Sequence, residues 1–149
     1  MTAPRSVRFE ESVLSRLDHY VKEHPGSSSS SVANMFIDEA LRSHEHPGIV
    51  FRPGPTGRRA ALAGGPDVWE VVAALNALRD EDAELDGDPL LLELGNVTGL
   101  KAAQVAVVLR YYAAYPVEVD ERIAHNSEVA DREEQLWAAQ QKLLRKRGS

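Results

Sequence analysis

The stretch Arg5-Ser6-Val7-Arg8-Phe9 decides the fold, because it predicts a strand that has no second strand near it. Polar and apolar side chains alternate along it, so Val7 and Phe9 would face one side and Ser6 and Arg8 the other. So short a strand is not stable alone. No other strand-like run lies within hairpin reach. We therefore expect it to pair with the same segment of a second copy of the chain.

Two amphipathic helices are predicted after this strand. Apolar residues recur at helical spacing over residues 11–24, and again from the serine run Ser27–Ser31 to about His44. Pro25-Gly26 separates the two helices. One short strand and two helices can bury little apolar surface by themselves, so the sequence predicts an intertwined homodimer over residues 1–45.

This arrangement resembles the ribbon-helix-helix family of DNA-binding proteins, of the CopG and Arc repressor type. The resemblance covers residues 4–43 and rests on the runs 5–9, 11–17 and 32–42. It implies that two strands pair antiparallel and enter the DNA major groove as a ribbon. The outward strand residues would contact base edges, and the start of the second helix would contact phosphate. The implied base-contacting residues are Pro4, Ser6 and Arg8, and the implied phosphate-contacting residues are Ser28, Ser29, Ser30 and Ser31.

The N-terminal pattern departs from the family in two places, since Pro4 occupies an outward position and Arg5 an inward one. Arg8 is therefore the one strong base reader. Two alternatives stay open. Ser6 and Arg8 are merely exposed residues on a dimerisation ribbon, or the serine run only caps the second helix.

Residues 46–116 are predicted to form a small helical domain. The blocks 46–49 (His-Pro-Gly-Ile) and 67–72 (Asp-Val-Trp-Glu-Val-Val) resemble the DUF433 family, which is common in antitoxins of the VapB type. The two last helices have helix-turn-helix form, but the second is so apolar that we expect a buried core helix. The elements expected are a hairpin over 49–52 and 59–62, a helix over 68–79 capped by Asp67, a short helix over 90–94, a turn over 95–99 and a helix over 100–115.

Residues 117–149 predict a long amphipathic helix with a thin apolar stripe. Its apolar residues include Ile123, Ala130, Trp137 and Leu144, which are spaced seven apart. In antitoxins the segment after the DNA-binding unit wraps a toxin, often as an amphipathic element. By that resemblance the partner-binding residues are Leu136, Trp137, Leu143 and Leu144. Packing within the homodimer is the alternative.

The charge of the chain is uneven. The 149 residues hold 17 Lys and Arg against 23 Asp and Glu, a net charge of −6. Residues 1–66 hold eight basic and seven acidic side chains, and residues 67–149 hold nine basic and sixteen acidic. A broad phosphate-neutralising surface is therefore absent, and any DNA binding should depend on a few contacts. The acidic second half favours a basic protein partner.

Enzyme and membrane signatures are absent from the sequence. There is no cysteine, and no nucleophile elbow, Walker loop, dinucleotide glycine pattern or metalloprotease helix. The five histidines are scattered, so we expect them at helix caps and on the surface, with no metal and no cofactor. No run of about 18 apolar residues and no signal core occurs, which predicts a cytoplasmic location without membrane contact.

The sequence thus predicts a mainly α protein that is no enzyme. It would be a homodimeric, sequence-specific DNA-binding transcriptional regulator. In its most specific form it is the autorepressing antitoxin of a type II toxin–antitoxin pair. Its partners would be a palindromic double-stranded operator, a second copy of itself, with higher oligomers on DNA as a further option, and a basic toxin. The alternative is a dimeric protein–protein interaction adaptor without DNA binding.

Overall fold

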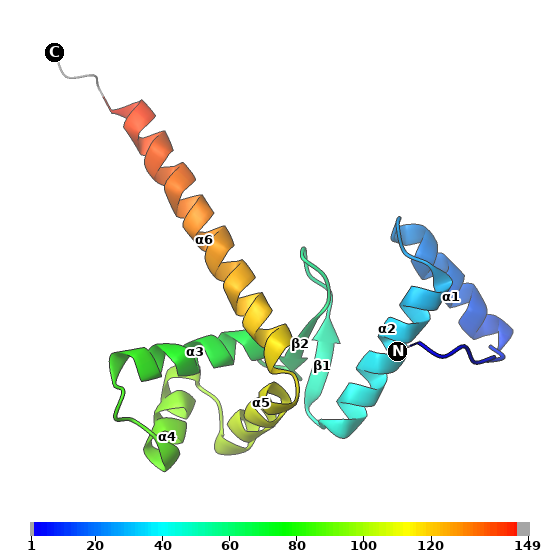
Figure 1. Ribbon diagram of the computed structural model, residues 1–149, viewed down its shortest axis with the longest axis horizontal. Helices are drawn as coiled ribbons and strands as arrows, with labels where there is room; N and C mark the ends of the chain where they lie inside the picture. The colour runs from blue at the N-terminus through cyan, green and yellow to red at the C-terminus, as the bar shows by residue number, and fades with distance from the viewer. Residues whose placement is uncertain (1, 146–149) are drawn as a thin grey trace. The chain divides into compact units, whose positions relative to one another are not determined.

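The computed structural model describes residues 2–145 and is mainly helical, as predicted (Figure 1). Over this range the chain forms six helices and one two-stranded antiparallel sheet. It divides into two compact units, one ending at Glu45 and the other beginning at His46. Among the described residues, no helix is both long enough and apolar enough to cross a membrane.

The first unit consists of α1 (Glu11–Glu23) and α2 (Ser29–Glu45), which lie where the apolar spacing predicts them. The two helices pack against each other, and the rings of Tyr20 and Phe36 meet edge to face at 4.9 Å. Residues 2–10 have no regular secondary structure and pair with no strand in the described part of the chain. A strand at 5–9 would need the second copy, so it stays a prediction.

The second unit begins with the predicted hairpin. β1 (Ile49–Arg52) pairs antiparallel with β2 (Arg59–Leu62), and Ile49 lies opposite Leu62. Both of these residues are buried, whereas the hairpin tip between the strands is largely exposed. One end of the hairpin therefore lies in the core, and its tip lies at the surface of the unit.

Four helices complete this unit: α3 (Val68–Glu81), α4 (Gly87–Thr98), α5 (Ala102–Ala114) and α6 (Pro116–Leu144). As expected for a core helix, α5 buries Val105, Val108 and Tyr111. The hairpin and all four helices contribute to a single core, made of Ile49, Leu62, Val68, Val71, Val72, Leu75, Leu90, Leu94, Val105, Val108, Tyr111 and Val119.

The predicted turn at 95–99 is wrong, because α4 continues through it to Thr98. A Cβ on Gly95 would lie 3.1 Å from the backbone oxygen of Leu100, so glycine here permits a close approach within a helix. Gly99 caps the helix, and its φ of +71° is the left-handed conformation of a C-terminal cap. Glycine therefore serves packing at position 95 and helix termination at position 99.

Two side chains of this unit differ from expectation. Asp67 precedes α3 but makes no capping hydrogen bond to it, because its buried carboxylate binds Arg59 and Trp69 instead. His46 is buried rather than on the surface, and its ring packs edge to face on Tyr111 at 5.3 Å. Both residues belong to the interior of the second unit.

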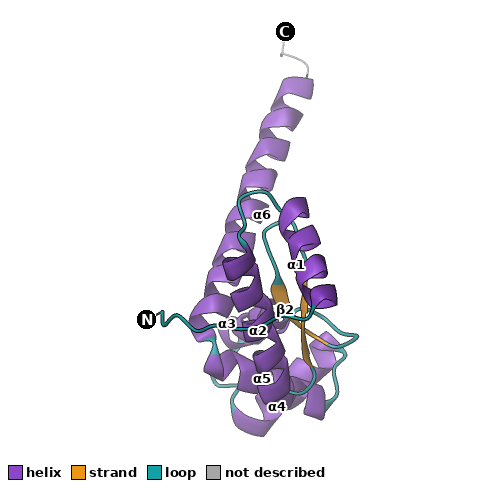
Figure 2. Ribbon diagram, turned by 90° about the vertical axis from the view of Figure 1, so that its right-hand side faces the viewer, coloured by secondary structure: helices purple, strands orange, loops and turns teal. Residues whose placement is uncertain are grey.

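The last helix, α6, begins at Pro116, which suits the first helical turn. It has 29 residues, which corresponds to a length of about 43 Å. Only its first turns pack on the unit, through buried Val119 and half-buried Ile123. Its second half projects away from the rest of the unit (Figures 1 and 2).

Candidate functional site

The implied DNA-reading residues lie in the N-terminal segment 2–10, where every side chain is exposed. Pro4, Ser6 and Arg8 therefore project into solvent, but so do Val7 and Phe9, which are 59% and 41% exposed. Two large apolar side chains are thus exposed close together on this segment, a pattern typical of an interaction surface when other apolar side chains extend it.

The helices of the first unit continue this apolar surface. Val32 is the one hydrophobic residue that is buried in the described part of this unit. A groove of about 380 Å³ opens between the helices, and its apolar lining comprises Phe9, Val13, Leu17, Tyr20, Ala33, Phe36 and Ile37. The phenyl ring of Phe9 thus shares a groove with residues of both helices, while Arg8, its neighbour, lies outside it.

The serine run forms the start of α2. The backbone N–H of Ser28 donates to the hydroxyl of Ser31 at 3.0 Å, and the N–H of Ser31 donates back to the hydroxyl of Ser28 at 3.1 Å. This reciprocal pair is a helix cap, as the capping alternative expects. Ser29 and Ser30 are exposed in the first turn, where helix geometry leaves backbone N–H groups without an intrahelical partner.

The implied partner-binding residues lie on the projecting half of α6. Leu136 and Trp137 are 58% and 62% exposed, and Leu143 and Leu144 are 85% and 72% exposed. Residues 127–140 are exposed without interruption, so this half makes no packing contact with its own unit.

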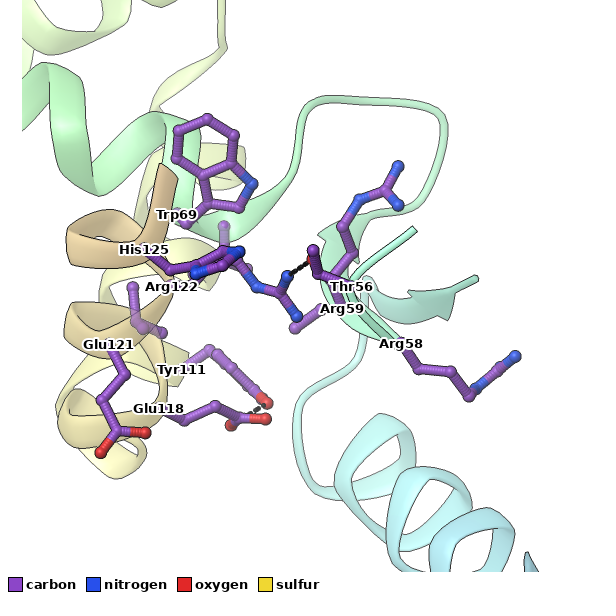
Figure 3. Close-up of a pocket in the computed structure, with 12 residues that line it drawn as sticks. Thr56, Arg58, Arg59, Trp69, Tyr111, Glu118, Glu121, Arg122 and His125 are labelled. Carbon is purple, nitrogen blue, oxygen red and sulfur yellow. Dashed lines mark hydrogen bonds between the residues drawn. The ribbon is translucent and has the colours of Figure 1, made fainter. Parts of the chain in front are cut away.

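A cleft in the second unit has no counterpart in the sequence predictions (Figure 3). It has a volume of about 330 Å³ and lies between the hairpin tip, the start of α3 and the first turns of α6. Buried Val68, Tyr111 and Val119 form its apolar floor. Trp69 stands at one side and Tyr111 with Glu118 at the other (Figure 3).

Polar groups in this cleft form hydrogen bonds with one another. Arg122 of α6 donates to the hydroxyl of Thr56 at the hairpin tip, 66 residues away. The Tyr111 hydroxyl donates to Glu118 at 3.2 Å. Nothing in the spacing of the sequence connects Thr56 with Arg122, so only the tertiary fold could reveal this site. In residues 2–145 no group of three His, Asp or Glu side chains is placed to hold a metal ion.

Comparison with known proteins returns no match: no family model, no curated protein and no solved structure matches the chain. The resemblances to the ribbon-helix-helix and DUF433 families therefore rest on the sequence motifs. The structure adds three surfaces to them, namely the open apolar side of the first unit, the projecting half of α6 and the cleft.

Proposed function

We propose that the protein is a sequence-specific DNA-binding transcriptional regulator that works as a homodimer through residues 1–45. The observation that carries this proposal is the open apolar side of the first unit. Phe9 and Ile37 line its groove while 41% and 52% exposed, and Val7 is 59% exposed beside them. A unit with so little buried surface requires a partner to be stable.

A second copy of the same segment fits this surface. Two segments 5–9 paired antiparallel would place Val7 and Phe9 of both copies over the helices. Fully burying an exposed side chain of this size contributes about 1.5–3 kcal/mol, and Val7 and Phe9, which are 59% and 41% exposed, would contribute part of that. The alternation of side chains then puts Ser6 and Arg8 on the opposite, outer face of the ribbon.

That outer face suits the DNA major groove. A guanidinium can donate two parallel hydrogen bonds to guanine, and a serine hydroxyl can bond either kind of base edge. The ribbon would present Ser6 and Arg8 twice, related by two-fold symmetry, to a palindromic operator. The exposed first turn of α2, at Ser29 and Ser30, would meet the flanking phosphates.

The second unit supports a protein partner, as an antitoxin requires. Residues 46–149 hold twelve basic and sixteen acidic side chains, a net charge of −4. The projecting half of α6 offers exposed Leu136, Trp137, Leu143 and Leu144 to that partner. A basic toxin encoded next to this chain would complement both features, and the antitoxin would repress its own promoter in the cytoplasm.

Selection from a library of random DNA duplexes tests the DNA-binding role without knowledge of the operator. The wild-type chain should enrich a two-fold symmetric motif. Arg8→Ala should enrich none, whereas Arg132→Ala, which removes an exposed arginine from α6, should enrich the same motif. Failure of the folded wild type to enrich any motif would exclude the proposal.

The adaptor function is the second candidate, and the exposed stripe of α6 favours it. Here the ribbon would be only a dimerisation device. A pull-down with the product of the neighbouring gene, followed by a DNA shift assay with and without that product, separates the two. The adaptor predicts capture of the product and no shift in either sample, whereas the regulator predicts a shift.

A further inference from the structure

We infer that the cleft of the second unit binds a small aromatic monocarboxylate, with Arg122 as its counter-ion and Trp69 as its aromatic wall. The inference is independent of the DNA-binding proposal, because all the residues that line the cleft belong to the second unit.

The shape of the cleft fits a small ligand. Its volume of about 330 Å³ lies in the range of small-molecule sites, which are concave, mostly apolar and supplied with a few polar groups. The floor is part of the core: Tyr111 is 0% exposed and Val68 1%. Because these residues are fixed by packing, the cleft exists before any ligand enters.

The charges in the cleft single out Arg122. Arg59, the other arginine near Trp69, already pairs with the buried carboxylate of Asp67. Arg122 instead donates to Thr56, whose hydroxyl is neutral and cannot balance a guanidinium. Figure 3 shows the Arg122 side chain extending from α6 toward Thr56. Arg58 also lines the cleft, but its guanidinium donates to the backbone oxygen of Phe51 at 3.4 Å. A carboxylate could replace or share the Thr56 contact and accept two parallel hydrogen bonds from Arg122.

The same charges argue for a single negative charge on the ligand. The Glu118 carboxylate lies in the cleft and accepts the Tyr111 hydroxyl proton at 3.2 Å. Glu121 also lines the cleft, so a dianion such as a phosphate monoester would meet stronger repulsion from these carboxylates than a monocarboxylate would. The half-exposed indole of Trp69 offers a planar face, against which an aromatic ring packs better than an alkyl chain.

The two tryptophans of the chain provide a built-in test. Trp69 lines the cleft, and Trp137 lies on the projecting half of α6, so their indole N–H signals in a proton–nitrogen correlation spectrum report on separate places. Benzoate is the probe. We expect it to move the Trp69 signal with saturation and to leave the Trp137 signal unchanged. Benzamide, which lacks the charge, and acetate, which lacks the ring, should bind at least about tenfold more weakly.

Variants of two arginines on α6 complete the test. Arg122→Gln should weaken benzoate binding by about tenfold or more, because it replaces a charged donor by a neutral one. Arg132→Gln, an exposed position outside the cleft, should bind benzoate like the wild type. The native amide dispersion of each spectrum shows that the variant is folded. An unmoved Trp69 signal, equal binding of benzamide, or unchanged binding by folded Arg122→Gln would each overturn the inference.

Discussion

The buried carboxylate of Asp67 links the hairpin to the start of α3. Its side chain is only 7% exposed, and it pairs with Arg59 and lies 3.7 Å from Arg52, both on the hairpin. It also accepts the indole N–H of Trp69 at 3.2 Å. The position before a helix suggested a capping role, because a carboxylate there has the same sequence signature whichever donors it finally binds.

Replacing Asp67 by alanine should therefore destabilise the protein. The change leaves two guanidinium groups without their shared anion and Trp69 without its acceptor. Breaking a fully buried pair costs about 3–5 kcal/mol. Because the two arginine side chains are about one-third exposed and water can reach them, we expect a smaller loss, of about 2–3 kcal/mol. Urea unfolding measures it, with Asp131→Ala at an exposed site as the control. Equal stability of the two variants would show that Asp67 has no such role.

Tyr112 gives a prediction about pH. Its hydroxyl donates to Asp120 at 2.7 Å. This hydrogen bond, with smaller effects of burial and of the Asp120 charge, raises the pKa of Tyr112 above 10.0, while Arg79 opposes the shift. A raised pKa in the folded state means that the contact contributes stability fully below pH 10.0 and loses it as the pH rises through the folded value.

Tyr112→Phe should therefore be less stable than the wild type at neutral pH, and the gap should narrow at alkaline pH. Urea unfolding of both proteins at several pH values measures this gap. A gap that stays constant or widens as the phenol ionises would show that the Asp120 contact does not favour the neutral form.

Among the elements, the segment 5–9 is the one on which the proposed DNA-binding dimer depends most. The two helices of the first unit begin and end within about two residues of their predicted bounds, since apolar spacing and Pro25-Gly26 define them locally. In the proposed dimer the hydrogen-bonding partner of this segment belongs to a second copy, so the ribbon would not form within one chain.

Phe9→Asp should disrupt the homodimer. It would place one carboxylate in the groove of each copy, whose lining is apolar except for Arg16 and which a second copy is expected to cover. Analytical ultracentrifugation should show two chains for the wild type and for Arg8→Ala, whose side chain lies outside the groove, but one chain for Phe9→Asp. A wild type that sediments as a single chain at micromolar concentration would contradict the dimer.

In the second unit, sequence patterns are sufficient to predict some elements and not others. The hairpin and α3 follow from local turn residues and apolar spacing, and the thin apolar stripe predicted the long last helix, which begins at Pro116. α4 was predicted too short, because Gly95 resembles a turn residue until the approach of Leu100 is known. The cleft was not predicted at all, since its residues come from four elements and meet only in the folded unit.

Because the whole molecule divides into its two units after residue 45, the net charge that bears on DNA binding is that of residues 1–45. Arg52, Arg58 and Arg59 belong to the second unit, so the first unit holds five basic and seven acidic side chains, a net charge of −2. A unit of this charge cannot bind DNA by general attraction. In the proposed dimer, specificity would therefore come from a few contacts that the two-fold symmetry doubles.

The salt dependence of DNA binding should accordingly be shallow. Each neutralised phosphate contributes a slope of about −0.9 to a plot of log affinity against log salt concentration. Ser29 and Ser30 of both copies would make about four phosphate contacts per dimer. We therefore expect a slope no steeper than about −4. Titrations of the selected duplex over a range of salt concentrations measure it. A slope near −8 would point to a broad basic surface that the charge distribution does not provide.

The most direct test of the central claim is the affinity of the full chain for DNA with and without Arg8. Fluorescence anisotropy of a labelled duplex, either the selected motif or the promoter upstream of its own gene, measures it for the wild type and for Arg8→Ala, with circular dichroism to show that both are folded. Since a good bidentate base contact is worth about 1–3 kcal/mol and a dimer makes two, we predict a loss of at least about thirtyfold for Arg8→Ala. Unchanged binding by folded Arg8→Ala would contradict the account.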